Sequence, residues 1–200
     1  MVRCQRARDC ARGVIMFDHI VLLTDLSDAT RLAFPPLTAF ARVFQSRVTI
    51  FHAFRGSSEL FSLSGDAAQV RAVIDEADRQ RVMPTLGRWA AELSAAGVPT
   101  AIETRVGSTF DLAIDVLVEL NADLAVVSTQ GMHEFTGRML GSPTARLLRD
   151  SRVPVLSVNE QFSERAAEFA GCQRIVHPID FSGPWQHTMA AAEAVGAELG

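Results

Sequence analysis

The most constraining feature of the sequence is a regular alternation of short apolar runs with longer amphipathic segments. The first run, His19-Ile-Val-Leu-Leu-Thr24, is continuously apolar and has the length of a strand. Unbroken apolar runs are typical of parallel strands buried on both faces, because helices cover both sides of such a sheet. The alternation therefore predicts an α/β fold with right-handed crossovers. Strands are predicted at residues 19–24, 47–53, 99–106, 123–127 and 153–158.

The segments between these runs carry the start and stop signals of helices. Helices are predicted at residues 29–44, 66–96 and 109–121, and a short one follows Ser142 and ends near Asp150. Pro35 and Pro36 fall inside the first of them and predict a kink or a late start. Gly97 is the expected stop of the long second helix.

The amino-acid composition excludes several classes of function. The formal net charge is −4, which gives no indication of a nucleic-acid binder. All 19 basic residues are arginine, because the sequence contains no lysine. A Walker A phosphate loop, a Schiff-base enzyme and a lysine general base are thereby excluded.

Cysteine usage and hydropathy indicate a reduced, cytoplasmic protein. Cys4, Cys10 and Cys172 have neither zinc-site nor redox spacing, so no metal site is predicted. No run approaches the roughly 18 apolar residues of a membrane span.

The predicted domain organisation has four parts. Residues 1–15 form a basic leader, expected to be disordered or a gene-start artefact before Met16. Residues 16–158 form one complete domain, and residues 159–171 read as a linker. In residues 172–200, Arg174-Ile-Val-His-Pro-Ile-Asp180-Phe-Ser182 repeats the pattern of His19-Ile-Val-Leu-Leu-Thr-Asp25-Leu-Ser27, so a truncated second copy is expected.

Parallel sheets of this type bind ligands outside the carboxyl ends of their strands. Asp25 follows the first strand, in Thr-Asp-Leu-Ser-Asp. Ser128-Thr-Gln-Gly131 is followed by nine residues and then by Gly141-Ser142. The strand that closes the domain lies in Arg152-Val-Pro-Val-Leu-Ser-Val158. These three features resemble the universal stress protein family, whose nucleotide loop has the usual form Gly-x2-Gly-x9-Gly-Ser or Thr. Residues 174–199 look like the opening of a second copy, as in tandem members of that family.

This resemblance implies a doubly wound five-stranded parallel sheet in the order 3-2-1-4-5, of the adenine-nucleotide α/β type. In one branch of the family this fold holds ATP without a Walker lysine, with the aspartate on adenine and the glycine loop on ribose and phosphates. The positions that carry over as a nucleotide site are Asp25, Ala53, Val127, Ser128, Gly131, Gly141 and Ser142, and Thr144 could add a donor at the helix start. No catalytic residue is assigned.

Two departures from the family loop predict that ATP binding is weak or absent. Ser128 stands where the family has its first glycine, and Pro143 has no N–H to give to a phosphate. Ser142 and Pro143 can equally form an ordinary helix start, and Asp25 can simply cap the next helix. His52 and His133 lie near the same strand ends and are interpreted as packing or surface residues.

The leading functional hypothesis is a cytoplasmic stress-response module that acts by association rather than turnover. The alternatives are a slow ATP hydrolase of the same fold and a structural interaction domain that binds no nucleotide. Homodimerisation, or pairing of tandem domains, is expected through the closing strand at residues 153–158, because an uncovered strand edge invites pairing.

Overall fold

The computed structural model describes residues 17–54, 67–107, 109–128, 142–159, 175–176, 189, 192–193 and 195–197. Of residues 67–72, 109–111 and 142–145 it describes the backbone alone. The described residues form a five-stranded parallel sheet in the order β3-β2-β1-β4-β5, which confirms the predicted fold and strand order. The strands are β1 (His19–Thr24), β2 (Arg47–Phe54), β3 (Thr100–Val106), β4 (Leu124–Ser128) and β5 (Val155–Val158). The helices are α2 (Asp28–Arg31), α3 (Phe34–Val43), α4 (Ala67–Ala95), α5 (Thr109–Glu119) and α6 (Ser142–Asp150).

Three strands begin one or two residues later than predicted: β3, β4 and β5. Two of these shifts, those of β3 and β5, have the same physical reason. β3 begins after Pro99 and β5 begins after Pro154. Proline cannot donate a ladder hydrogen bond, so a strand tends to start beyond it. Each proline instead supplies a carbonyl, which accepts from the N–H of Val48 and of Ala125 respectively, at 2.8 and 2.9 Å.

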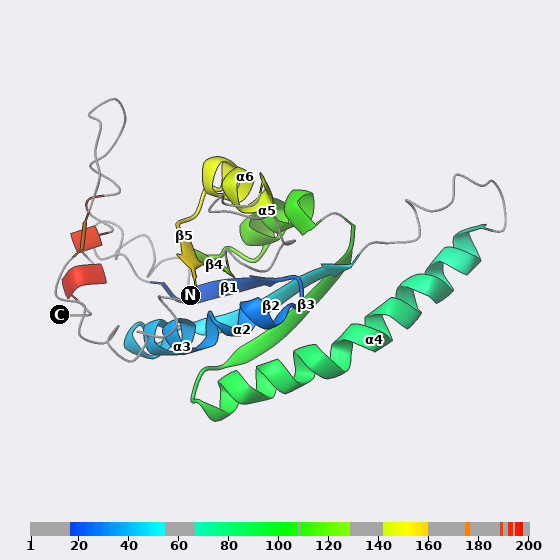
Figure 1. The fold of residues 1–200 in the computed structure, drawn as a ribbon, viewed down its shortest axis with the longest axis horizontal. Helices are drawn as coiled ribbons and strands as arrows, with labels where there is room; N and C mark the ends of the chain where they lie inside the picture. Colours follow the sequence, from blue (N-terminus) through cyan, green and yellow to red (C-terminus); the bar gives the residue numbers. More distant parts are fainter. Residues whose placement is uncertain are drawn as a thin grey trace, which may run out of the picture.

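The sheet lies between two layers of helices. Figure 1 shows α2, α3 and α4 on one face and α5 and α6 on the other. Each face has its own buried cluster: Ile20, Leu22 and Val126 belong to the first, and Val21, Leu23 and Val127 to the second. Successive side chains of a strand point to opposite faces, so this alternation decides which end-of-strand residues share a face.

The predicted first helix is divided in two, as its prolines suggested. α2 ends at Arg31, and α3 starts at Phe34 with prolines in its first turn, where the missing N–H costs no hydrogen bond. Gly97, with φ +84°, follows the end of α4 and confirms the predicted stop.

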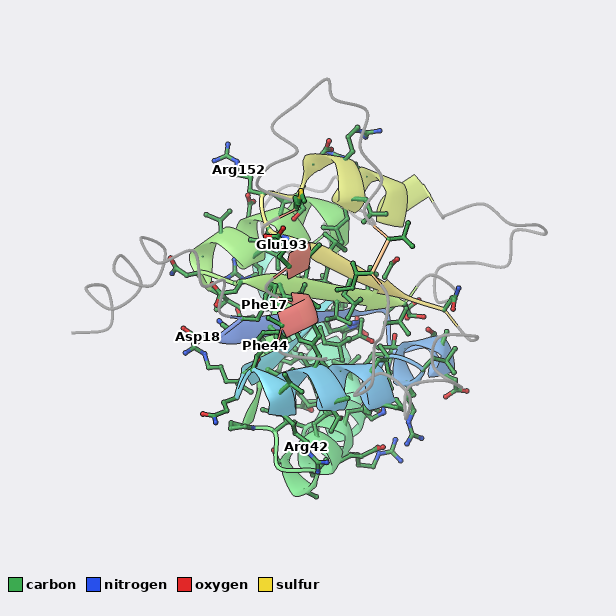
Figure 2. The ribbon with its side chains drawn as sticks, turned by 90° about the vertical axis from the view of Figure 1, so that its left-hand side faces the viewer. Phe17, Asp18, Arg42, Phe44, Arg152 and Glu193 are labelled. Carbon is green, nitrogen blue, oxygen red and sulfur yellow. The ribbon has the colours of Figure 1, made fainter. Side chains whose placement is uncertain are left out.

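The amino-terminal edge of the sheet is closed by aromatic packing. Phe17 meets Phe40 and Phe44 edge-on, with both pairs of ring centroids 5.1 Å apart. Figure 2 views this end of the molecule and labels Phe17 and Phe44. Val195, near the C-terminus, packs against the buried cluster on the α2–α4 face.

Little of the predicted second copy falls within the described residues. Ile175 and Val176 belong to no strand and are 40% and 80% exposed. Residues 189, 192–193 and 195–197 are helical. The leader at 1–15 and the linker from residue 160 onward lie outside the described residues, so the division into domains stays a prediction.

Candidate functional site

The carboxyl ends of β1, β2 and β4 meet at one edge of the sheet. Leu23 is in register with Val127, and Thr24 is in register with His52. β1 and β4 are neighbours whose crossovers leave on opposite faces, through α2 and α3 and through α6. This is the topological switch point, the place where open α/β sheets have their ligand crevice.

The residues at this edge divide between the two faces of the sheet. Ala53 and Val127 pack in the cluster on the α5–α6 side. Asp25 lies just beyond the end of β1, and its carboxylate accepts hydrogen bonds from Ser27 and from Thr30 of α2. Of the predicted nucleotide residues at this edge, Asp25 is thus held from the α2 side, and Ala53 and Val127 lie on the α5–α6 face.

Ser128 lies on the other face. It follows Val126, a member of the α2–α4 cluster, by two residues, and it is 6% exposed. Its hydroxyl oxygen is buried and has no hydrogen-bond partner among the described residues. The side chain that stands in place of the family's first glycine is therefore directed into the α2 side of the sheet, while the Ser128 backbone remains at the edge.

Asp25 is held by a short network in the turn that follows β1. Its Oδ1 accepts from the Ser27 N–H at 2.9 Å and from the Thr30 hydroxyl at 3.3 Å. Leu26 takes a left-handed conformation, φ +64°, and its N–H donates to Thr24 Oγ1 at 2.8 Å. The Thr24 hydroxyl in turn donates to Thr30 Oγ1 at 3.0 Å. Hydrogen bonds thus restrain the turn on both sides of the carboxylate. Within the described residues, Asp25 Oδ2 makes no hydrogen bond.

A second orphaned hydroxyl lies at the same edge. Ser27 precedes α2 but does not cap it, and its Oγ is buried without a hydrogen-bond partner in the part of the chain that the structure describes. An unsatisfied buried hydroxyl costs about 1–3 kcal/mol, so each such group calls for an explanation. Both hydroxyls, of Ser27 and Ser128, flank the β1–β4 switch point.

His52 is the titratable group buried at this edge. It is 7% exposed, and its Nδ1 lies 2.9 Å from the carbonyl oxygen of Thr24. Burial lowers the pKa of His52 below its ordinary value of 6.5, and the bond to the Thr24 carbonyl and the Asp25 carboxylate oppose this shift. The imidazole is therefore neutral at pH 7, with its proton on Nδ1.

The remaining predicted site residues are described only in part. Ser142 and Thr144 lie in the first turn of α6, and their side chains fall outside the description. Gly131, Gly141 and His133 lie outside the described residues altogether. No group of three or more metal-ligating side chains occurs among the described residues.

The sequence interpretation missed the polar residues that support Asp25. Thr24, Ser27 and Thr30 carry no motif signal, because hydroxyl residues after a strand usually mark a turn or a cap. The one indication in the sequence is their spacing, because a short helix after the strand brings Thr30 back toward Thr24 and Asp25.

Comparison with known proteins agrees with the fold. The family model for the universal stress protein family matches residues 16–159. The chain therefore belongs to the universal stress protein family, within the larger class of doubly wound parallel α/β proteins. No significant match is found among curated proteins.

Solved structures show the same fold at low sequence identity. A universal stress protein from Archaeoglobus fulgidus superposes with a TM-score of 0.71 and 20% identity, over 92% of this chain and 64% of that one. UspA from Lactobacillus plantarum gives a TM-score of 0.61 and 17% identity, over 72% of this chain and 98% of that one. A family member from Burkholderia pseudomallei gives 0.54 and 22%, over 72% and 96%. Among the described residues, no helix is long and apolar enough to cross a membrane.

Proposed function

We propose that this chain is a cytoplasmic stress-response module that binds an adenine nucleotide weakly at the β1–β4 switch point. The observation that carries the proposal is the Asp25 carboxylate. One of its oxygens is fixed by the Ser27 N–H and the Thr30 hydroxyl, and Oδ2 makes no hydrogen bond within the described residues. A carboxylate oxygen held in this way is a pre-positioned acceptor for the amino group of adenine.

The neighbouring residues suit a flat apolar base. Ala53 and Val127 contribute small side chains from the same cluster, at the edge of the sheet where Asp25 lies. The orphaned hydroxyls of Ser27 and Ser128 border the same switch point and are polar groups that a ligand or its hydration could satisfy. The residues present therefore fit the nucleotide that the family resemblance implies.

We place the phosphates at the loop that leads into α6. Backbone N–H groups at a helix start bind anions, and Ser142 and Thr144 lie in the first turn of this helix. Pro143 withholds one of those donors, which supports weak binding.

We propose that the module acts by association, with a second copy of this chain as its partner. β5 is the last strand at one end of the sheet order, and its Ser157 is exposed while Val155 and Leu156 are half-buried. A strand at that position offers backbone groups for pairing with another chain. Light scattering at micromolar concentrations should give the mass of a dimer, and the mass of a monomer would contradict this part of the proposal.

Calorimetric titration with ATP tests the nucleotide proposal. The wild-type protein should bind at micromolar to millimolar concentrations, and Asp25→Ala should lose about tenfold or more, since a hydrogen bond to a charged group contributes roughly 1.5–3 kcal/mol. Asp28→Ala is the matched control, because Asp28 is an exposed carboxylate three residues away and should leave the affinity unchanged. No heat of binding at millimolar ATP would contradict the proposal and favour a structural interaction domain. Phosphate released over hours would instead favour the hydrolase.

A further inference from the structure

His52 connects the end of β2 to the turn that holds Asp25. It is in register with Thr24 and follows Ile50 by two residues, so its side chain lies on the α2–α4 face. From there the ring reaches the neighbouring strand, and Nδ1 lies 2.9 Å from the Thr24 carbonyl oxygen. A carbonyl only accepts hydrogen bonds, so Nδ1 carries the proton and donates it.

The Thr24 carbonyl belongs to the peptide group that joins Thr24 to Asp25. Fixing this carbonyl therefore fixes the plane from which the Asp25 side chain departs. The other side-chain hydrogen bonds of this turn come from within residues 24–30, through Thr24, Ser27 and Thr30. Among the side-chain hydrogen bonds described for the turn, the His52 contact is the one that comes from another strand.

The ring is packed so that it cannot easily turn away. His52 is 7% exposed and stacks against Phe54 at a centroid distance of 6.5 Å, with 29° between the planes. Its register partner on the other side is Thr104 of β3, which is uncharged. Because the ring is buried and has little freedom to move, its hydrogen bond also restrains the carbonyl that it binds.

One carboxylate faces this imidazole. Asp25 is the charged group that acts on His52 through space. Glu103 and Arg105 of β3 alternate with Thr104 and pair with each other on the opposite face. The residues that α4 packs into the shared cluster are uncharged: Leu86, Trp89 and Leu93. From α2, Asp28 is exposed and Thr30 is neutral.

We propose that His52 is a positioning residue for Asp25: its Nδ1–H holds the Thr24–Asp25 peptide group and so orients the carboxylate for the nucleotide. This inference rests on the proposed function. It also gives that function a pH dependence. Protonation at Nε2 leaves the Nδ1–H bond to the Thr24 carbonyl in place and adds a positive charge to the ring that Asp25 faces. That charge competes with the nucleotide for the carboxylate, so nucleotide affinity decreases as the pH falls through the range in which His52 is protonated.

Two substitutions separate the hydrogen bond from the packing of the ring. His52→Phe keeps an aromatic ring without a donor, and His52→Asn keeps an N–H at the distance of Nδ1 without a titratable group. In calorimetric titrations with ATP at pH 7.5, His52→Phe should weaken binding about five- to tenfold, as expected for the loss of one neutral hydrogen bond. His52→Asn should stay within about twofold of wild type. Between pH 7.5 and 5.5 the wild-type affinity should fall, whereas the affinity of His52→Asn should change less. Equal affinities for wild type and His52→Phe, or equal losses in both variants, would overturn the proposal.

A second measurement needs no nucleotide and separates this inference from the proposed function. The amides of Leu26 and Ser27 donate within the Asp25 turn. Their hydrogen exchange should accelerate in His52→Phe and remain close to wild type in His52→Asn. If that pattern appears and no variant binds ATP, the positioning role stands and the nucleotide proposal fails. If these amides exchange equally in all three proteins, the positioning role is wrong, whatever ATP does.

Discussion

The ring of Phe34, in α3, meets the indole of Trp89, in α4, edge-on, with centroids 5.4 Å apart and planes at 88°. Both side chains belong to the buried cluster on the α2–α4 face. The pair therefore joins the helix of the first crossover to the helix of the second. An edge-to-face pair contributes about 0.5–1.5 kcal/mol beyond the area that it buries. A double-mutant cycle with Phe34→Leu and Trp89→Leu, measured by urea denaturation, should return a coupling free energy in that range. A coupling near zero would show that the two rings act as independent apolar residues.

The ion pair between Arg31 and Glu92 should matter much less. It also joins the first crossover to α4, with a guanidinium nitrogen 3.0 Å from a carboxylate oxygen. The two side chains are 52% and 49% exposed, however, and water screens exposed charges. We expect Arg31→Ala to change the free energy of unfolding by less than about 1 kcal/mol. A larger loss in the same urea titrations would show that this contact does more than an exposed ion pair can.

Replacing either of two glycines with alanine should change the free energy of unfolding, in opposite directions at the two positions. Gly107 has φ +144°, and a Cβ there would lie 2.8 Å from Leu112 Cδ1. Gly107→Ala should therefore destabilise the protein by about 1–3 kcal/mol, the usual cost of a strained backbone. Gly87 lies inside α4, and a Cβ there would have open space around it, so Gly87→Ala should stabilise by about 0.5–1 kcal/mol. Urea denaturation of both variants measures the two changes in the free energy of unfolding. Changes of the same sign would contradict the backbone conformations given for Gly107 and Gly87.

Stability should decrease in acid partly through His52. Burial lowers the pKa of His52 below 6.5 in the folded protein, while the unfolded chain keeps the ordinary value. Between the two values the unfolded state binds more protons, so the free energy of unfolding falls as the pH is lowered through about 6.5. The contribution is fully present above that pH. His52→Phe should show a shallower fall between pH 7.5 and 5 than wild type, with the four other histidines common to both proteins. Parallel curves for the two proteins would mean that His52 titrates alike in the folded and unfolded states.

The fold could be predicted from the sequence because its signals are local and agree with one another. The run at 19–24 coincides with β1, and the prolines at 35 and 36 and the glycine at 97 mark real helix boundaries. The starts of β3 and β5 were predicted too early, at Pro99 and just before Pro154. The apolar pattern alone does not show that a proline lacks the N–H of a ladder hydrogen bond. The strand order came from the family resemblance and is confirmed.

The candidate site could be predicted only as a set of positions. Sequence order placed Asp25, Ala53 and Val127 at one edge, which parallel topology makes unavoidable. It did not predict that the Ser128 side chain turns to the α2 face, because the facing depends on the register of β4 against β1. Nor did it predict the bond from His52 to the Thr24 carbonyl, which joins residues 28 positions apart.

The most direct test of the central claim is an NMR titration of the isotope-labelled protein with ATP, because it locates the nucleotide as well as detecting it. We expect the backbone amides of Asp25, Leu26 and Ala53 to shift in a saturable manner, together with that of Ser128. The amino-terminal edge, represented by Asp18 and Ala122, should remain unchanged. Saturable shifts confined to the amino-terminal edge, or no shifts at millimolar ATP, would contradict nucleotide binding at the β1–β4 switch point.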